Sequence, residues 1–262
     1  MVPDRDELFT ITDEGYERVA HLRTFPLPGG HRAIKEPRRS ALGLLYERFG
    51  DDAFEMDHLA PIRSFTSSEL KVLKQSLKQG INAPRTSSVG RLFDAVASLC
   101  DLRQTIDFEG EAAMALEFAL DGSEAHSPDN KGLHITSGEE ERPWTLDWAP
   151  ILDAVLADLN ENTATAGTSA RFHDALATAV CALAERAQAP TVVLTGGCFQ
   201  NPSLQRLAER RLRPSSIQVY GHGRTPSNDG GVALGQLIST SVDRQAGNPG
   251  ESGSTSRRAP RG

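Results

Sequence analysis

Two glycine-rich segments near the C-terminal end contain residue types that suit an anionic ligand beside a metal ion. In the first, Thr-Val-Val-Leu (191–194) predicts a buried strand, because it is uncharged and rich in β-branched residues. Gly196 and Gly197 follow, and they allow close approach of a ligand because they carry no Cβ. Asn201 and Pro202 then predict the start of a helix, whose free N–H groups attract anions.

The second segment, Pro-Ser-Asn-Asp-Gly-Gly (226–231), predicts a turn that opens a last helix, with the carboxylate of Asp229 at its start. Carboxylates are reasonable ligands for iron, zinc or magnesium. Each segment also has a simpler interpretation: a tight turn at the glycines, a helix cap at Asn201 and an Asx turn at Asp229. Both segments in this order, at junctions between elements, favour a nucleotide beside a metal ion.

These two segments resemble the C-terminal end of the HypF family of hydrogenase-maturation carbamoyltransferases. Three further segments agree with that family: Arg-Val-Ala-His-Leu-Arg-Thr-Phe-Pro-Leu-Pro-Gly-Gly (18–30), Thr-Ser-Ser-Val-Gly-Arg-Leu-Phe-Asp-Ala-Val-Ala (86–97) and Phe-Glu-Gly-Glu-Ala-Ala-Met-Ala-Leu-Glu (108–117). The similarity covers roughly residues 13–237. The domain concerned is also similar to the enzyme that places threonylcarbamoyl on tRNA. The resemblance implies an α/β protein with an incomplete actin-like ATPase fold: a mixed sheet with flanking helices and a helical insertion.

The chain also departs from the family pattern. Family members carry an acylphosphatase domain, a zinc-finger pair and a nucleotide-activating domain before the part matched here. The three cysteines, Cys100, Cys181 and Cys198, have no CxxC spacing, so zinc fingers are not expected. No two of the seven histidines lie four residues apart, so the family's His-x-x-x-His metal pair is missing. We therefore expect the chain to correspond to about the last third of a family member and to begin inside a domain.

The resemblance assigns roles to individual residues. Asp94 matches a carboxylate that grips ribose hydroxyls, and Asp229 matches a metal ligand. The residues that match the nucleotide-binding positions are Asp94, Gly110, Glu111, Gly196, Gly197 and Asn201. A solvated helix charge at Asp94 and an ordinary acidic helix start at Glu111 remain as alternatives.

Three other residues with reactive side chains receive no functional assignment. Cys198 follows a predicted buried strand and has no base at a fixed spacing, which favours a small hydrophobic residue over a nucleophile. His173 is predicted to be a surface or half-buried residue of a long helix, and no partner is identified for His222.

Composition sets the general class of the protein. With 262 residues, 38% hydrophobic content and a formal charge of −7, we expect a soluble, acidic, cytoplasmic protein that binds neither nucleic acid nor membranes. Helical periodicity predicts helices at 67–79 and 168–187, and the polar stretch 121–142 predicts a surface loop or weak hairpin. The predicted organisation is a frayed N-terminus (1–12), a partial carbamoyl-transfer domain (13–240) and a disordered tail (241–262). Within the domain, a helical middle spans about 37–162 and a nucleotide-binding α/β end spans about 168–240.

The resemblance implies binding of ATP or carbamoyl-adenylate and transfer of the carbamoyl group to the C-terminal cysteine of HypE. A divalent metal, iron, zinc or magnesium, is expected only if other ligands are supplied. A separate N-terminal HypF half is an expected partner, and the isolated chain is expected to be inactive. The alternatives are a truncated, non-catalytic relic or partner-binding module, and an actin-like small-molecule kinase, which the details of the two segments disfavour.

Overall fold

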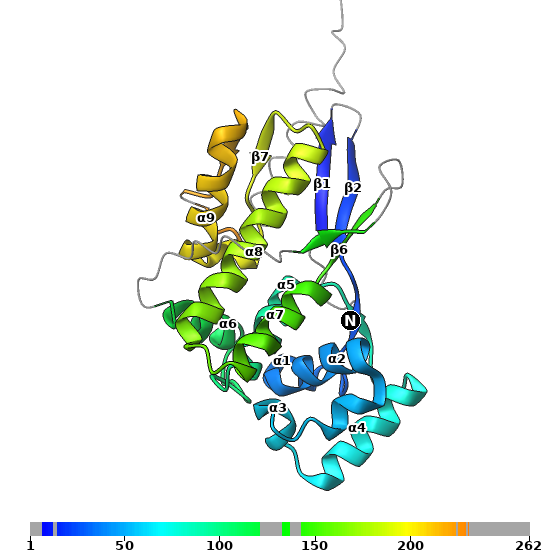
Figure 1. The fold of residues 1–262 in the computed structure, drawn as a ribbon. Coiled ribbons are helices and arrows are strands. Elements are labelled where there is room, and N and C mark those ends of the chain that lie inside the picture. Colours follow the sequence, from blue (N-terminus) through cyan, green and yellow to red (C-terminus); the bar gives the residue numbers. More distant parts are fainter. Residues whose placement is uncertain are drawn as a thin grey trace, which may run out of the picture.

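The computed structural model describes residues 7–12, 15–120, 133–136, 143–223, 225–228 and 230. Helices α1–α7 gather at one end, and strands flanked by α8 and α9 form the other (Figure 1). The described helices are α1 (Arg32–Lys35), α2 (Pro37–Phe49), α3 (Ala60–Arg63), α4 (Ser67–Gln79), α5 (Val89–Leu99), α6 (Glu111–Phe118), α7 (Ala149–Asn160), α8 (Thr165–Arg186) and α9 (Pro202–Leu212), with 3-10 turns η1 (Gly50–Glu55), η2 (Gly197–Gln200) and η3 (Arg213–Ser215).

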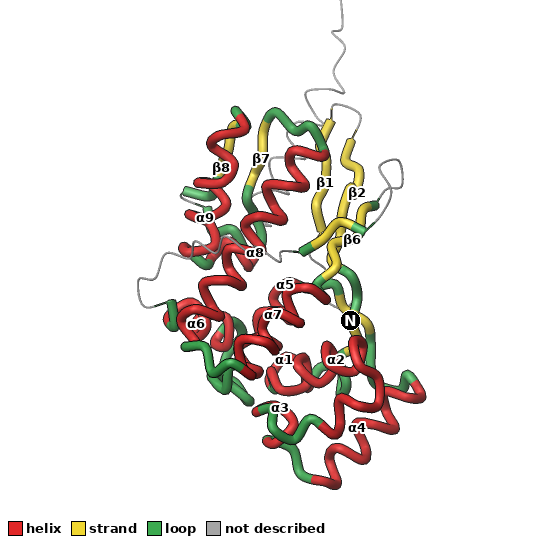
Figure 2. Tube along the Cα trace, in the orientation of Figure 1, coloured by secondary structure: helices red, strands yellow, loops and turns green. Residues whose placement is uncertain are grey.

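The strands in the described part of the chain form three small sheets. They are β1 (Glu7–Thr12), β2 (Gly15–Leu22), β3 (Phe25–Pro26), β4 (Arg85–Thr86), β5 (His134–Ile135), β6 (Trp144–Asp147), β7 (Thr191–Val193) and β8 (Gln218–Tyr220). The largest sheet has the order β1-β2-β6-β5, with β2 and β6 parallel and the outer pairs antiparallel. β7 and β8 form a parallel pair beside α8 and α9 (Figure 2). β3 pairs with β4. Mixed sheets with flanking helices confirm the predicted α/β class.

Helix α4 has the bounds that the sequence predicts. The Thr66 hydroxyl accepts a hydrogen bond from Glu69 N at 3.2 Å, and the Glu69 carboxylate accepts one from Thr66 N at 2.8 Å. This reciprocal capping box satisfies two N–H groups that the first helical turn leaves without a partner. Gly80 ends the helix with φ +65°, a left-handed conformation that glycine adopts without strain.

Helix α8 connects the helical end with the sheets (Figure 1). Its C-terminal half packs Leu183 against Val19 of β2, and the neighbouring Ala184 belongs to the same apolar core as Val192 of β7. The predicted bounds, 168–187, lie within three residues of those observed. One helix therefore covers both the four-stranded sheet and the β7–β8 pair.

Helix α2 is enclosed by the core on nearly all sides, unlike a helix with a single apolar stripe. It packs on α5 and lies against β3. Gly43 makes this approach possible, because a Cβ at this position would lie 1.9 Å from the carbonyl oxygen of Pro26. No helix in the described part of the chain is both long enough and apolar enough to cross a membrane.

Two structural predictions need correction. Residues Glu7–Thr12 are not frayed, because they pair with β2 along their whole length. β7 was predicted to be buried, but Val193 is 58% exposed. Val192 packs on the helices, whereas Thr191 and Val193, which point to the other face of the β7–β8 pair, are exposed.

Several predictions fall outside the described residues. They concern the tail (241–262), the last helix after Gly230 and most of the stretch 121–142. Within that stretch, His134–Ile135 forms the short strand β5. The predicted helical middle, 37–162, is mostly helical and also contains β4, β5 and β6.

Candidate functional site

The diglycine turn follows β7, as the sequence predicts. Gly196 has φ +97°, which requires glycine, and Gly197 begins η2. A Cβ added to either glycine would meet no other atom within 4 Å, so the space above both residues is open. The Gly196 N–H is engaged, because it donates to the Ser227 carbonyl at 2.8 Å. The turn therefore has open space for a ligand, and it is tied to the segment that leads to Asp229.

Asn201 lies at the start of α9 and caps it. Its Oδ1 accepts a hydrogen bond from Leu204 N at 2.8 Å, and Pro202 occupies the first helical turn. Its Nδ2 lies 2.9 Å from His173 Nε2. The capping role is confirmed, and the side chain has a second, buried partner on α8 that the sequence did not reveal.

Asp94 lies on α5, which contacts the η2 turn beside the glycines. Its side chain is 2% exposed, and its Oδ2 forms a 2.8 Å ion pair with Arg91. Arg91 also lies 3.5 Å from Glu109. The alternative of a solvated helix charge is therefore wrong for Asp94. A role in holding ribose hydroxyls stays a prediction, and it requires the buried carboxylate to become accessible to the ligand.

Gly110 and Glu111 form the start of α6, as predicted. Gly110 has φ +88°, and the Glu111 carboxylate accepts a hydrogen bond from Asp107 N at 2.8 Å and pairs with Arg103 at 2.8 Å. The backbone hydrogen bond from Asp107 and the contact with Arg103 lower the pKa of Glu111. Glu111 thus stabilises the turn before α6 as an ionised group.

The other end of α6 reaches α9. Glu117 Oε1 accepts a hydrogen bond from Ser203 N at 3.1 Å, in the first turn of α9. The structure therefore brings α5, α6, α8 and the diglycine turn together around the start of α9. Gly110 and Glu111 lie at the opposite end of α6 from this contact.

Asp229, the predicted metal ligand, lies outside the described residues. In the part of the chain that the structure describes, no group of three or more His, Cys, Asp or Glu side chains could hold a metal ion. A single carboxylate binds a divalent ion weakly. The described residues therefore form no such group, and binding of iron, zinc or magnesium with ligands from elsewhere stays a prediction.

Two histidines have contacts that the sequence did not predict. His173, predicted to be exposed or half-buried, is 0% exposed and contacts Asn201. His222, for which no partner was identified, lies 2.8 Å from the Thr195 hydroxyl beside the diglycine turn. Helical periodicity alone gives no signal for either contact, because each joins segments about 27 residues apart in sequence.

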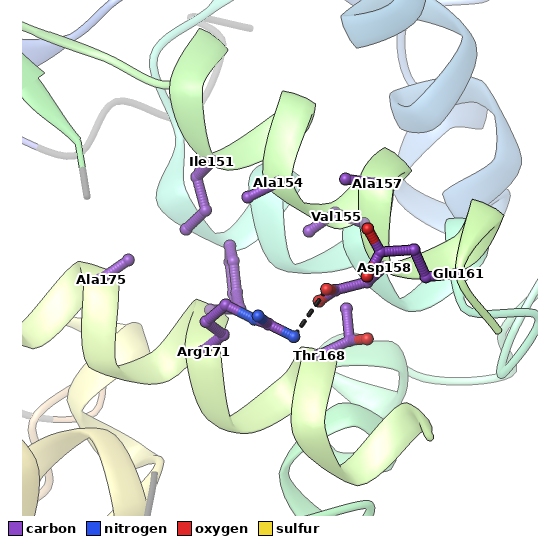
Figure 3. A pocket seen from close by; sticks show the side chains of 10 residues that line it. Ile151, Ala154, Val155, Ala157, Asp158, Glu161, Thr168, Arg171 and Ala175 are labelled. Atoms are coloured by element: carbon purple, nitrogen blue, oxygen red, sulfur yellow. Dashed lines mark ion pairs between the residues drawn. The ribbon is translucent and has the colours of Figure 1, made fainter. Parts of the chain in front are cut away.

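A separate pocket of about 280 Å³ lies between α7 and α8 (Figure 3). Apolar residues line it, together with an ion pair in which Arg171 lies 2.6 Å from Asp158. None of the residues predicted to bind nucleotide or metal lines this pocket. It therefore does not coincide with the site at the start of α9.

Comparison with known proteins identifies the family. A family model described as "Carbamoyltransferase, Kae1-like Domain, second subdomain" matches residues 6–236. The chain belongs to the HypF carbamoyltransferase family. The match spans all residues that the sequence assigned to nucleotide or metal binding, and it confirms the resemblance found in the sequence.

HypF relatives match most of this chain but only part of their own length. The carbamoyltransferase HypF of Rhodobacter capsulatus is 40% identical over 235 residues, which are 88% of this chain and 29% of the relative. That of Synechocystis sp. is 33% identical and is matched over 91% of this chain and 32% of its own length. The chain thus spans about a third of these relatives.

Solved HypF structures share the fold. The crystal structure of full-length HypF in the phosphate- and nucleotide-bound form has a TM-score of 0.74 and 29% sequence identity, and the match covers 92% of this chain and 40% of that one. The crystal structure of T. kodakarensis HypF has a TM-score of 0.73 and 25% identity, and the match covers 88% of this chain and 30% of that one. The likeness therefore includes both the helical end and the sheets.

Proposed function

We propose that this chain is the part of a HypF-type enzyme that holds ATP or carbamoyl-adenylate and passes the carbamoyl group to the C-terminal cysteine of a HypE-type protein. Membership of the HypF family supports the carbamoyl chemistry. The observation that carries the nucleotide assignment is the open diglycine turn directly before the capped start of α9. Backbone N–H groups at a helix start, with no Cβ in front of them, suit a phosphate.

The transfer step follows from the chemistry of an acyl phosphate. The cysteine sulfur of the acceptor attacks the carbamoyl carbon, and an S–C bond forms. The C–O bond to the adenylate phosphate breaks, AMP leaves with the electron pair, and the thiol proton passes to water. The Gly197 N–H at the start of η2 would hold the phosphate and stabilise the charge that grows on it as AMP leaves.

Turnover in this proposal requires a complementing N-terminal HypF half. The chain spans about a third of its relatives, and the matched family model is described as a second subdomain. Exposed apolar residues of β1, β7 and β8 offer a surface for such a half: Ile11 is 81% exposed, Val193 58% and Tyr220 53%. Exposed apolar surface of this kind is typical of protein–protein contacts.

Nucleotide binding is tested by calorimetric titration of the full chain with ATP. Gly197→Val adds a side chain where the fold leaves open space, so we expect an unchanged thermal melt and a loss of ATP binding by about tenfold or more. Asp94→Ala tests the ribose assignment in the same titration. ATP binding that Gly197→Val leaves unchanged would contradict the placement of the phosphate.

Carbamoyl transfer is tested with radiolabelled carbamoyl phosphate, ATP and a HypE-type protein. We expect no label on the acceptor with the chain alone. Label should appear when the N-terminal two thirds of the Rhodobacter capsulatus relative is added as the complementing half. Turnover by the isolated chain, or no turnover with both parts and intact ATP binding, would refute this proposal. The latter result would favour the non-catalytic, partner-binding alternative.

A further inference from the structure

A buried histidine on α8 contacts the residue that caps α9. His173 is 0% exposed, and its ring packs edge-on against Phe93 at 5.3 Å and Phe172 at 5.9 Å between ring centroids. These two aromatic rings fix the plane of the imidazole. The position of its two nitrogens is therefore determined by the fold.

The hydrogen bonds of His173 determine its tautomer. Nδ1 lies 2.8 Å from the Ser169 carbonyl oxygen, which can only accept, so Nδ1 carries the proton and donates. Nε2 is then the acceptor, and it faces Asn201 Nδ2 at 2.9 Å. Burial lowers the pKa of His173, which keeps the ring neutral near pH 7 and preserves this arrangement.

The histidine in turn fixes the orientation of the Asn201 amide. Nδ2 donates to His173, and Oδ1 accepts from Leu204 N at 2.8 Å. A flipped amide would place oxygen against the Nε2 lone pair and an N–H group against the Leu204 N–H. Both contacts would be repulsive, so only one orientation is compatible with this environment. It leaves the second Nδ2 hydrogen without an acceptor among the described residues.

We propose that His173 is a positioning residue that holds the Asn201 amide so that its second Nδ2 hydrogen points to an oxygen of the bound nucleotide. The inference rests on the proposed function, because it assigns the ligand at the start of α9 as a nucleotide. His173 does not touch the ligand and acts through Asn201. The fixed tautomer of His173 on α8 thus orients the Asn201 amide, which lies directly after the diglycine turn.

Protonation of His173 would release this arrangement. An imidazolium carries N–H on both nitrogens, so Nε2 would face the Asn201 amide donor with a proton of its own. Of the titratable groups around the ring, Glu117 of α6 favours the imidazolium, whereas Asp94 of α5 is paired with Arg91 and Asp174 of α8 with Arg211. Burial opposes protonation near neutral pH, so nucleotide affinity should fall only in the acidic range.

The first test is calorimetric titration of the full chain with ATP between pH 7.5 and pH 5.5. His173→Gln retains an acceptor oxygen near the Nε2 position, and we expect an affinity at pH 7.5 within about threefold of the wild type. His173→Leu removes the acceptor, and we expect about a tenfold loss, the size of one hydrogen bond. His222→Gln is the matched control, since this histidine is exposed and bonds Thr195, not Asn201.

The pH profile separates positioning from a merely structural role. Protonation of ATP itself affects all variants equally. It therefore cancels in the ratio of the ATP association constant of the wild type to that of His173→Gln. We expect this ratio to fall on acidification for the wild type and for His222→Gln measured in the same way, by less than about tenfold at pH 5.5 because burial lowers the pKa of His173. A ratio that stays constant while nitrogen-15 NMR shows His173 taking up a proton in this range overturns the inference.

A second test needs no nucleotide. Nitrogen-15 NMR at pH 7.5 should show His173 protonated at Nδ1, and Asn201→Asp should raise the pKa of His173, because a carboxylate oxygen would then face Nε2. An Nε2–H tautomer, or no rise in the pKa, overturns the positioning role itself. Absence of ATP binding by the wild type at every pH, with the expected NMR result, overturns the proposed function and leaves the fixed amide as a structural feature only.

Discussion

The close approach of β3 to α2 gives a sharp prediction for a single methyl group. Gly43 lies in the middle of α2, and a Cβ there would be 1.9 Å from the Pro26 carbonyl oxygen. That is about 1.5 Å closer than the ~3.5 Å at which non-bonded atoms attract best. The oxygen belongs to the backbone, so no side-chain rotation can relieve the overlap. The helix and β3 must move apart.

The size of the effect follows from two opposing terms. Overpacking of a core costs about 1–3 kcal/mol, and this site belongs at the upper end because the clash is with the backbone. Replacing glycine by alanine in a helix interior contributes about 1 kcal/mol in the opposite direction. Gly43→Ala should therefore lower the free energy of unfolding by about 2 kcal/mol. With an m-value of about 2 kcal/mol/M, the urea midpoint should fall by about 1 M.

The assay is urea unfolding followed by circular dichroism, with Gly90→Ala of α5 as the matched control. A Cβ at Gly90 would meet only the Ser88 hydroxyl at 3.4 Å, an ordinary contact. Helix propensity then dominates, and the control should gain between zero and about 1 kcal/mol. A Gly43→Ala protein as stable as the wild type would refute the inferred approach of β3 to α2.

Four further predictions concern caps, core, thiols and pH. Thr66→Ala removes the capping box of α4 and should cost about 1 kcal/mol in urea unfolding. Phe172→Ala, at a side chain that is 0% exposed, should cost about 3–5 kcal/mol, whereas Phe118→Ala, at 73% exposure, should stay within about 0.5 kcal/mol of the wild type. Burial raises the pKa of Cys100 to about 12, so a disulfide thiol reagent at pH 8 should modify it only after unfolding, as peptide mapping would show. Burial lowers the pKa of His173 in the folded protein, so the unfolded chain takes up a proton at this histidine at a higher pH than the folded chain does. The free energy of unfolding should therefore keep its full value above about pH 6.5 and fall by up to about 1.4 kcal/mol per pH unit below it. His173→Gln should remove this slope.

Local sequence signals predicted elements whose boundaries depend on nearby residues. Helical periodicity predicted α4, which the structure bounds with a capping box at Thr66 and the glycine at position 80, and Asn201 with Pro202 predicted the start of α9. These signals succeed because capping hydrogen bonds join residues three or four positions apart. The diglycine turn was predictable for the same reason, since a positive φ at Gly196 is a property of one residue.

The same signals could not predict how charged and polar side chains are partnered. Asp94 was assigned either to ribose or to solvent, but it forms a buried ion pair with Arg91. The pairing of Glu7–Thr12 with β2 was missed because the flanking charges suggested a frayed end. In both cases burial depends on elements that come together only in the folded chain.

The sequence by itself determined the family, the α/β class, the helix starts and the glycines that open a turn. These features depend on residue type and on the spacing of residues that are close together in the chain. Only the tertiary structure decided the chemistry around them. It placed His173 against Asn201, brought Glu117 to the first turn of α9 and left Val193 of β7 exposed. The physical reason is that hydrogen-bond partners, burial and pKa depend on distance in space, and these contacts join segments from about 28 to 86 residues apart.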